Sequence, residues 1–112
     1  MREVVILSGV RTAIGDYGGA LKQIAAVDLA SIVVREAVAR ASIDSQEVGH
    51  LVFGNVIHGE PRDMYLARVA SINGGLPQHT SALTVNRLCG SGLQAIISAS
   101  QQILLGDTDV AV

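Results

Sequence analysis

The sequence predicts an α/β fold with a mainly parallel sheet. Short aliphatic runs that have the character of buried strands alternate with longer segments of helical periodicity. Of the 112 residues, 49% are hydrophobic and 16% charged, which is enough apolar material for one modest core. We therefore expect a strand, a helix, a strand, a helix, an extended segment, a buried helix and a final strand.

The first part of the chain is expected to form a strand, a loop and a helix. Residues 4–7 are continuously aliphatic, as in a strand that is covered on both faces. Residues 11–22 are punctuated by glycines and predict a loop. A helix is expected over residues 28–41, where Glu36 precedes Arg40 at the i, i+4 spacing of an ion pair. Its predicted apolar stripe consists of Leu29, Val33, Ala37 and Val38.

The middle of the chain continues the alternation. Residues 44–47 have the spacing of a capping box and predict a short helical turn. The second strand is expected over residues 51–57. Pro61 prevents a continuous ladder after it, and helical spacing resumes over residues 64–72.

The last third contains an extended segment at residues 82–85, a helix at residues 93–105 and the start of a strand at residues 109–112. Residues 88–106 carry no charge, which suits a helix that is buried on most sides, although their Ser and Gln content is too high for a membrane span. Because the sequence stops inside an aliphatic run, we expect residues 1–112 to be part of a longer domain.

Composition excludes several classes of protein. A net charge of −2 without a basic cluster argues against a nucleic-acid partner. One cysteine excludes an internal disulfide and fits a reducing compartment, here the cytoplasm, and no signal-peptide pattern opens the sequence. One cysteine and three dispersed histidines do not have the spacing of a metal site. The glycines form neither a P-loop nor a Rossmann motif.

Cys89 is the candidate nucleophile because it lies where a strand should turn into a helix. Unpaired N–H groups and the helix macrodipole at that point favour a thiolate over a thiol. Gly90 and Gly92 would leave the sulfur accessible and let a substrate carbonyl approach the backbone N–H groups. The alternative is that Cys89 is a small buried hydrophobe beside two packing glycines.

The sequence around Cys89 resembles the nucleophile segment of thiolases, the acyl-CoA acetyltransferases that make and cleave 3-ketoacyl-CoA. The resemblance rests on residues 85–95 and, in the same register, on residues 8–15, 18–21, 52–56 and 106–112. Residues 60–68 are most similar to bacterial broad-range 3-ketothiolases, which supply polyhydroxyalkanoate precursors. The resemblance implies that residues 1–112 begin a thiolase N-terminal domain, and that the subunit is a homodimer or homotetramer.

The resemblance also implies a mechanism. Cys89 would form an acetyl-enzyme from acetyl-CoA in a ping-pong reaction, with its own N–H as an oxyanion donor, and Claisen condensation or its thiolytic reverse would follow. Coenzyme A thioesters are the substrates, and no cofactor is needed. In thiolases a second cysteine and a histidine in a G-H-P motif supply the other groups, and neither motif occurs here. We therefore expect half a site, inactive without the remaining polypeptide.

Four other side chains have alternative roles. We expect His50, at the start of the second strand, and His79, in a polar connection, to be solvated. His58 follows the carboxyl end of a strand, where sites of α/β proteins gather, so it is a candidate to line a pocket or, less favoured, to act as a base. Arg11 is expected to brace its loop through a salt bridge, with anion binding as the alternative.

Met64 is the other candidate substrate-binding residue. Thiolases commonly have a Q-N-P-A-R pattern here, of which only Ala67 and Arg68 remain. The resemblance places this stretch at the subunit interface near the partner's active site. An apolar wall at Met64 would bear on acyl-chain size, whereas core packing explains the residue equally well.

Two other functions remain open. One is a non-catalytic thiolase-like module whose apolar helices serve assembly or lipid binding. The other is β-ketoacyl synthase chemistry, which also uses a cysteine at a helix N-terminus. The G-H-P and C-x-G motifs in a downstream sequence would identify a thiolase.

Overall fold

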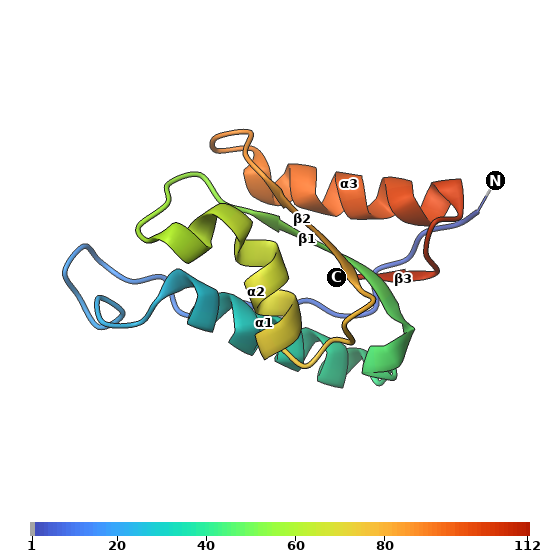
Figure 1. The fold of residues 1–112 in the computed structure, drawn as a ribbon, viewed down its shortest axis with the longest axis horizontal. Coiled ribbons are helices and arrows are strands. Elements are labelled where there is room, and N and C mark those ends of the chain that lie inside the picture. Colours follow the sequence, from blue (N-terminus) through green and yellow to red (C-terminus); the bar gives the residue numbers. More distant parts are fainter. Residues whose placement is uncertain (1) are drawn as a thin grey trace.

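The centre of the molecule is a three-stranded sheet in which both strand pairs are parallel. The computed structural model describes residues 2–112. The middle strand is β1 (Val48–Gly54), flanked by β2 (Ser81–Val85) on one side and β3 (Val110–Ala111) on the other. This sheet and its intervening helices confirm the predicted α/β class (Figure 1).

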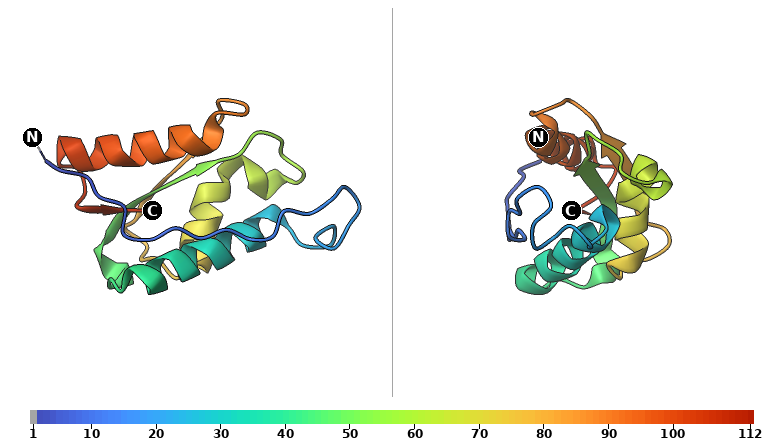
Figure 2. Two further views of the ribbon diagram at one scale, coloured as in Figure 1. Left: turned by 180° about the vertical axis from the view of Figure 1, so that it is seen from behind. Right: turned by 90° about the vertical axis from the view of Figure 1, so that its left-hand side faces the viewer.

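The helices lie in two layers on opposite faces of the sheet (Figures 1 and 2). One face is covered by α1 (Ala26–Ala41) and α2 (Leu66–Asn73), and the other by α3 (Ser91–Leu105). The core lies between α1, α2 and β1. Its apolar members include Val27, Val34, Leu51, Ala67 and Ala70, which are at most 1% exposed.

Helix α1 confirms the predicted helix, starting two residues earlier. It ends where Ser42 adopts a left-handed conformation and donates its N–H to the Ala39 carbonyl at 3.1 Å. The predicted pair of Glu36 and Arg40 is present at 2.7 Å. Of the predicted apolar stripe only Val38 is buried, and its other members are half-buried, because the face against α2 and the sheet is the neighbouring one. That buried face consists of Val27, Ala30, Val34 and Val38.

The capping box before β1 is confirmed. The Asp44 side chain accepts the Gln46 N–H at 2.9 Å and Glu47 reaches back to the Asp44 N–H at 3.3 Å, around the 3₁₀ turn η1 (Ser45–Glu47). This turn leads straight into β1, so the strand begins at Val48 rather than at the expected residue 51. It also ends three residues earlier than expected, at Gly54.

The predicted strand at residues 4–7 is wrong. This segment has no regular secondary structure, and Val5, Ile6 and Leu7 are 62%, 81% and 59% exposed. The segment pairs with neither outer strand of the sheet, β2 or β3, and is instead held to α1 by Ser8, whose hydroxyl donates to the Ala37 carbonyl at 2.7 Å. An aliphatic run indicates a strand only where a ladder partner exists.

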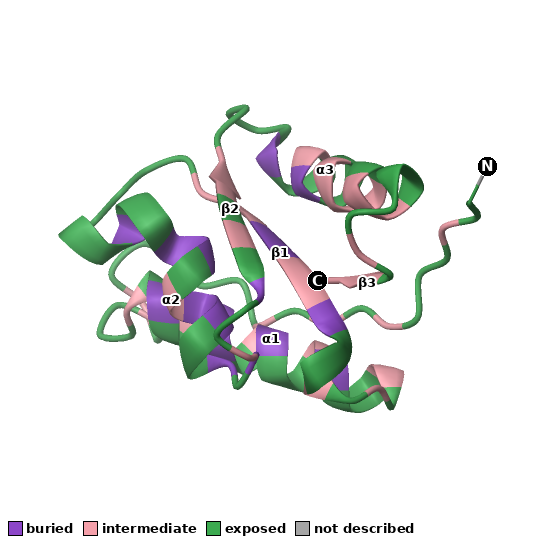
Figure 3. Cartoon of the chain, turned by 45° about the vertical axis from the view of Figure 1, so that its right-hand side comes forward, coloured by how far each residue is buried: buried purple, intermediate pink, exposed green. Residues whose placement is uncertain are grey.

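Helix α3 lies where it was expected, directly after the Cys89 turn, and much of its surface is exposed within residues 2–112. Of its residues, only Ser91 and Ala95 are buried, whereas Leu93 and Leu105 are 66% and 75% exposed. The sheet covers one side of the helix, and Figure 3 shows exposed and half-buried residues along the rest. Leu93, Ile96, Ile97, Leu104 and Leu105 form this exposed apolar face.

The segment after β1 divides into two helices instead of one. Pro61 opens the 3₁₀ helix η2 (Pro61–Tyr65), and α2 follows from Leu66. Extended residues at 82–85 are confirmed as β2, with one further residue at its start. Over residues 2–112, no helix has both the length and the apolar character to cross a membrane.

Candidate active site

Two connections leave the sheet together at the carboxyl ends of β1 and β2. The strands are in register, with Gly54 opposite Val85, and the ladder continues one step further through the Asn55 N–H, which donates to the Val85 carbonyl at 3.0 Å. In parallel sheets of α/β proteins, this edge is where ligands bind. The turn that carries Cys89 and the connection that carries His58 and Met64 therefore start side by side.

Cys89 lies on an exposed turn between β2 and α3. It precedes Gly90, the N-cap of α3, so the predicted strand–turn–helix placement is confirmed. No acidic residue occupies the first turn of α3, and no side chain caps it. The partial positive charge of the helix start is therefore not offset by a local carboxylate.

The backbone N–H of Cys89 takes no part in the hydrogen bonds of its turn. The Asn86 side-chain oxygen accepts the Leu88 N–H at 3.0 Å, and the N–H groups of Gly90 and Ser91 donate to the Arg87 and Leu88 carbonyls at 3.1 and 3.0 Å. None of these bonds uses the N–H of Cys89, so that donor is available beside the thiol.

The turn is tight and partly strained. Leu88 has a φ of 49°, a left-handed conformation that side chains with a Cβ rarely adopt. The end of β1 also lies close against the start of α3. A Cβ built on Gly54 would lie 2.8 Å from the carbonyl carbon and the Cβ of Ser91, so only glycine fits there.

A second set of bonds joins the two connections. The Asn86 side-chain amide donates to the Val56 carbonyl at 3.3 Å, and the Asn55 amide donates to the Asp63 carbonyl at 2.9 Å. These bonds tie the Cys89 turn to η2, on which Met64 is 61% exposed. Within residues 2–112, Met64 is therefore not part of the packed core.

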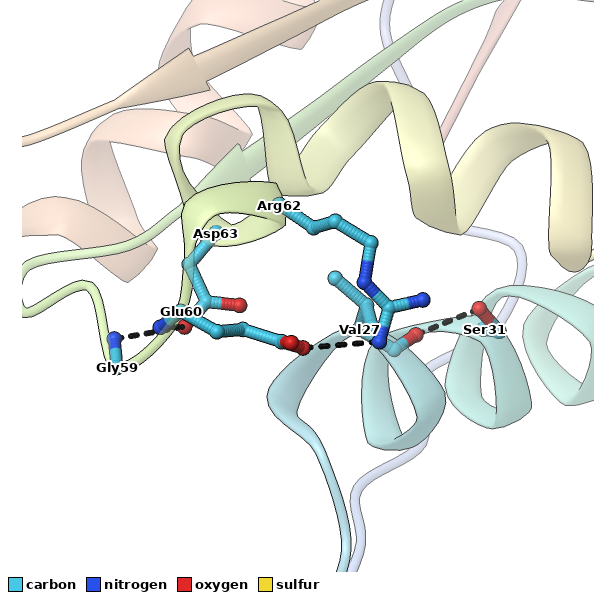
Figure 4. Close-up of polar contacts among 6 residues, drawn as sticks. All are labelled: Val27, Ser31, Gly59, Glu60, Arg62 and Asp63. Atoms are coloured by element: carbon cyan, nitrogen blue, oxygen red, sulfur yellow. Dashed lines mark hydrogen bonds and ion pairs between the residues drawn. The ribbon is translucent and has the colours of Figure 1, made fainter.

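Asp63 holds η2 in shape (Figure 4). Asp63 is 3% exposed, and its Oδ2 accepts the N–H groups of Gly59 and Glu60 at 2.8 and 3.1 Å. Beside it, Glu60 pairs with Arg62 at 3.0 Å. Met64 is thus carried by a short, internally bonded element rather than by a free loop.

The histidines stand in three different settings. His79 is exposed, as predicted. His50 is not a solvated edge residue, because it lies within the central strand, half-buried, with Nε2 buried and without a partner among residues 2–112. His58 is exposed after β1, at the predicted edge of the sheet, and no hydrogen bond joins its side chain to Cys89.

Arg11 does not form the expected salt bridge. Its guanidinium donates to the carbonyl of the adjacent Thr12 at 2.9 Å and takes part in none of the ion pairs of residues 2–112. The neighbouring acidic residue of the loop, Asp16, is likewise unpaired within that part of the chain. An exposed pair gains too little free energy to fix two long side chains in place.

An apolar cavity of about 630 Å³ lies between the N-terminal segment, α1, α3 and the β1–β3 side of the sheet. Neither Cys89 nor Met64 lines it. Across residues 2–112, no group of three or more His, Cys, Asp or Glu side chains is placed to hold a metal ion.

Sequence reasoning gave no individual role to the residues that shape this turn. Ser91 and Gly54 were only parts of longer motifs, and the left-handed conformation of Leu88 has no sequence signal. Asn86 did have a local signal. Asn favours Asx turns, in which its side-chain oxygen accepts the backbone N–H two residues later, here that of Leu88.

Comparisons with known proteins give a family, relatives and solved structures that resemble this chain. A family described as "Thiolase, N-terminal domain" matches residues 4–112. Beta-ketothiolase BktB from Cupriavidus necator is 68% identical over 111 residues, which are 99% of this chain and 28% of that protein. This chain thus spans little more than a quarter of the length of that relative.

Two solved structures share the fold at substantial identity. Acetyl-CoA acetyltransferase from Bacillus anthracis superposes with a TM-score of 0.90 at 40% identity, covering 96% of this chain and 27% of that one. Human mitochondrial 3-ketoacyl-CoA thiolase, solved in complex with CoA, gives a TM-score of 0.83 at 37% identity, covering 87% and 25%.

Proposed function

This chain belongs to the thiolase family, and we propose that it is the N-terminal segment of a subunit that transfers acyl groups between coenzyme A thioesters. The reaction is the condensation of acetyl-CoA to 3-ketoacyl-CoA and its thiolytic reverse. The single observation that supports this most is the exposed Cys89 thiol on a strand–turn–helix at the carboxyl edge of a parallel sheet.

In the proposed first half-reaction, the Cys89 thiolate attacks the acetyl-CoA carbonyl. A bond forms between Sγ and the carbonyl carbon, the bond from that carbon to the CoA sulfur breaks, and CoA leaves as the thiol after taking up the Cys89 proton through a base. The Cys89 N–H, which the bonds of the turn do not use, is the proposed donor to the tetrahedral oxyanion.

In the second half-reaction, another acetyl-CoA loses an α-proton to a base, and its α-carbon attacks the acetyl group on Cys89. The carbon–carbon bond forms, the bond to Sγ breaks and the thiolate is regenerated. The resemblance assigns the base and the donor to the enolate oxygen to a second cysteine and to the histidine of a G-H-P motif, neither of which occurs in residues 1–112. We propose that this chain supplies the nucleophile half of the site.

Met64 is the proposed substrate-contacting side chain. It is exposed on η2. Hydrogen bonds join η2 to the residues at the end of β1, and join those residues to the Cys89 turn. A flexible thioether suits a wall that contacts acyl chains of different lengths. His58 shares this edge of the sheet and is retained as a secondary candidate.

The setting of the enzyme follows from the same resemblance. We propose a cytoplasmic homodimer or homotetramer without a cofactor, acting on 3-ketoacyl-CoA in fatty-acid or polyhydroxyalkanoate metabolism. The human relative was solved with CoA, which supports the substrate class. A free, exposed thiol requires a reducing compartment to persist.

The test uses a complete subunit, made by joining residues 1–112 to the remaining polypeptide of Cupriavidus necator beta-ketothiolase. Radiolabelled acetyl-CoA should label Cys89 of the unmodified protein and leave Cys89→Ser unlabelled, because an alcohol is far less acidic than a thiol. Circular dichroism should show the same fold for both. A Cys89→Ser protein that is acetylated at a normal rate would refute the assignment, and absence of labelling from both would favour a non-catalytic module.

A further inference from the structure

The Ser91 hydroxyl is buried and makes two hydrogen bonds across the turn before it. Ser91 is 4% exposed. Its Oγ accepts the Arg87 N–H at 2.8 Å and donates to the Leu88 carbonyl at 2.6 Å. Its own N–H donates to the same carbonyl at 3.0 Å. Ser91 therefore holds the Leu88 carbonyl from two sides, through its side chain and its backbone.

The Leu88 carbonyl belongs to the peptide unit that also carries the Cys89 N–H. Because a trans peptide is planar, its C=O and N–H point in opposite directions. Fixing the carbonyl toward Ser91 directs the Cys89 N–H away from the helix start. This is the donor that the bonds of the turn leave free.

The conformation being held is an unfavourable one. Leu88 has a φ of 49°, a left-handed conformation that is sterically unfavourable for an L-residue with a Cβ. Such conformations persist only where surrounding bonds hold them, and they cluster at functional sites. Here Asn86 holds the Leu88 N–H and Ser91 holds the Leu88 carbonyl.

Ser91 is itself fixed by the sheet. The end of β1 approaches it so closely that a Cβ on Gly54 would overlap its backbone, and this contact keeps the first residue of α3 against the strand. The Ser91 hydroxyl therefore fixes the Leu88–Cys89 peptide relative to β1. It is buried behind the turn, away from any substrate at the exposed thiol.

We infer that Ser91 is the positioning residue for Cys89, orienting the Leu88–Cys89 peptide so that its N–H faces the acyl oxyanion. This inference rests on the proposed function, in which Cys89 carries the acyl group. It assigns Ser91 no contact with substrate and no proton transfer. The expected signature is a loss in kcat with little change in KM, because substrate binding does not involve Ser91.

The test compares variants of the complete subunit. Ser91→Ala should lower kcat for acetoacetyl-CoA thiolysis by about tenfold or more, less than the loss of an oxyanion donor outright. Ser100→Ala is the matched control, since that hydroxyl donates to the Ile96 carbonyl at 2.8 Å in the same helix, far from the turn, and it should stay within about twofold.

Combining Ser91→Ala with Leu88→Gly distinguishes a positioning role of Ser91 from a general effect on stability. Glycine adopts a positive φ without steric cost, so Leu88→Gly removes the strain that Ser91 opposes. Ser91→Ala should therefore reduce kcat less in the Leu88→Gly background than alone. Equal losses in both backgrounds, an unchanged kcat in Ser91→Ala, or misfolding that Leu88→Gly does not repair would each overturn the inference.

The two proposals fail in different ways. If the unmodified subunit labels Cys89 with acetyl groups and Ser91→Ala is fully active, only the positioning role fails. If the unmodified subunit does not label Cys89, the proposed function fails.

Discussion

Replacing Gly54 with Ala tests how closely β1 approaches the start of α3. The added Cβ would lie 2.8 Å from the Ser91 carbonyl carbon and Cβ and 2.9 Å from the Ser91 oxygen, whereas ordinary contact begins near 3.4 Å. Two of these three atoms are backbone and cannot rotate away. Strand and helix must therefore separate by about 0.6 Å, the difference between 3.4 and 2.8 Å.

The magnitude follows from two opposing effects. Overpacking of this kind costs about 1–3 kcal/mol, and Gly→Ala returns about 0.4–1 kcal/mol by restricting the unfolded chain. We expect a net loss of about 0.5–2 kcal/mol in unfolding free energy. Gly92→Ala is the control, because a Cβ there meets nothing within 4 Å and Ala in a helix gains about 0.5–1 kcal/mol over Gly.

The assay is thermal and urea unfolding of the complete subunit, followed by circular dichroism. Gly54→Ala should melt below the unmodified protein and Gly92→Ala at or above it. Gly54→Ala should also acetylate Cys89 more slowly at a temperature where both variants are folded, because the displaced Ser91 no longer holds the turn. Equal melting temperatures for the two variants would refute the close approach.

Two further predictions concern the acyl site and the exposed apolar face. Met64→Gln should lower kcat/KM for medium-chain relative to short-chain 3-ketoacyl-CoA by about threefold or more, since it puts a polar amide against the acyl chain, while Met64→Leu should keep the ratio; equal ratios for both variants would exclude Met64 from the acyl wall. Residues 1–112 alone should bind the dye ANS through the exposed face of α3 and should fail to cleave acetoacetyl-CoA. When the remaining polypeptide is added as a second chain, ANS binding should be lost and activity should be restored. A monomeric, cooperatively unfolding fragment with activity of its own would contradict this and make His58 the candidate base.

The sequence predicted the elements whose signals are local. The Asp44 capping box, the Glu36–Arg40 pair and the helix after Cys89 depend on residues within one turn of each other, and the structure contains all three. The strand expected at residues 4–7 failed because a strand also needs a partner elsewhere in the chain. Hydrophobic periodicity indicates the secondary structure that a segment prefers. It does not indicate whether another strand has a free edge to pair with that segment.

The same division holds at the site. The position of Cys89 between a strand and a helix was predicted, because the change from an extended run to helical spacing is visible in the sequence. The roles of Gly54 and Ser91 depend on the packing of β1 against α3, across 37 positions of the numbering. No pattern within a window of one element can reveal a contact of that kind.

The side-chain bonds to the backbone of the Cys89 turn come from Asn86 and Ser91, which are neutral, whereas the charged Arg87 side chain bonds to the Gln94 side chain on α3. Neither Asn86 nor Ser91 titrates near neutral pH, and bonds between neutral groups are hardly weakened by added salt. The geometry of the turn should therefore stay constant over a broad range of buffers. A change in the reactivity of Cys89 with pH or ionic strength would then report on the thiol and the charged groups that approach it, rather than on a rearranged support.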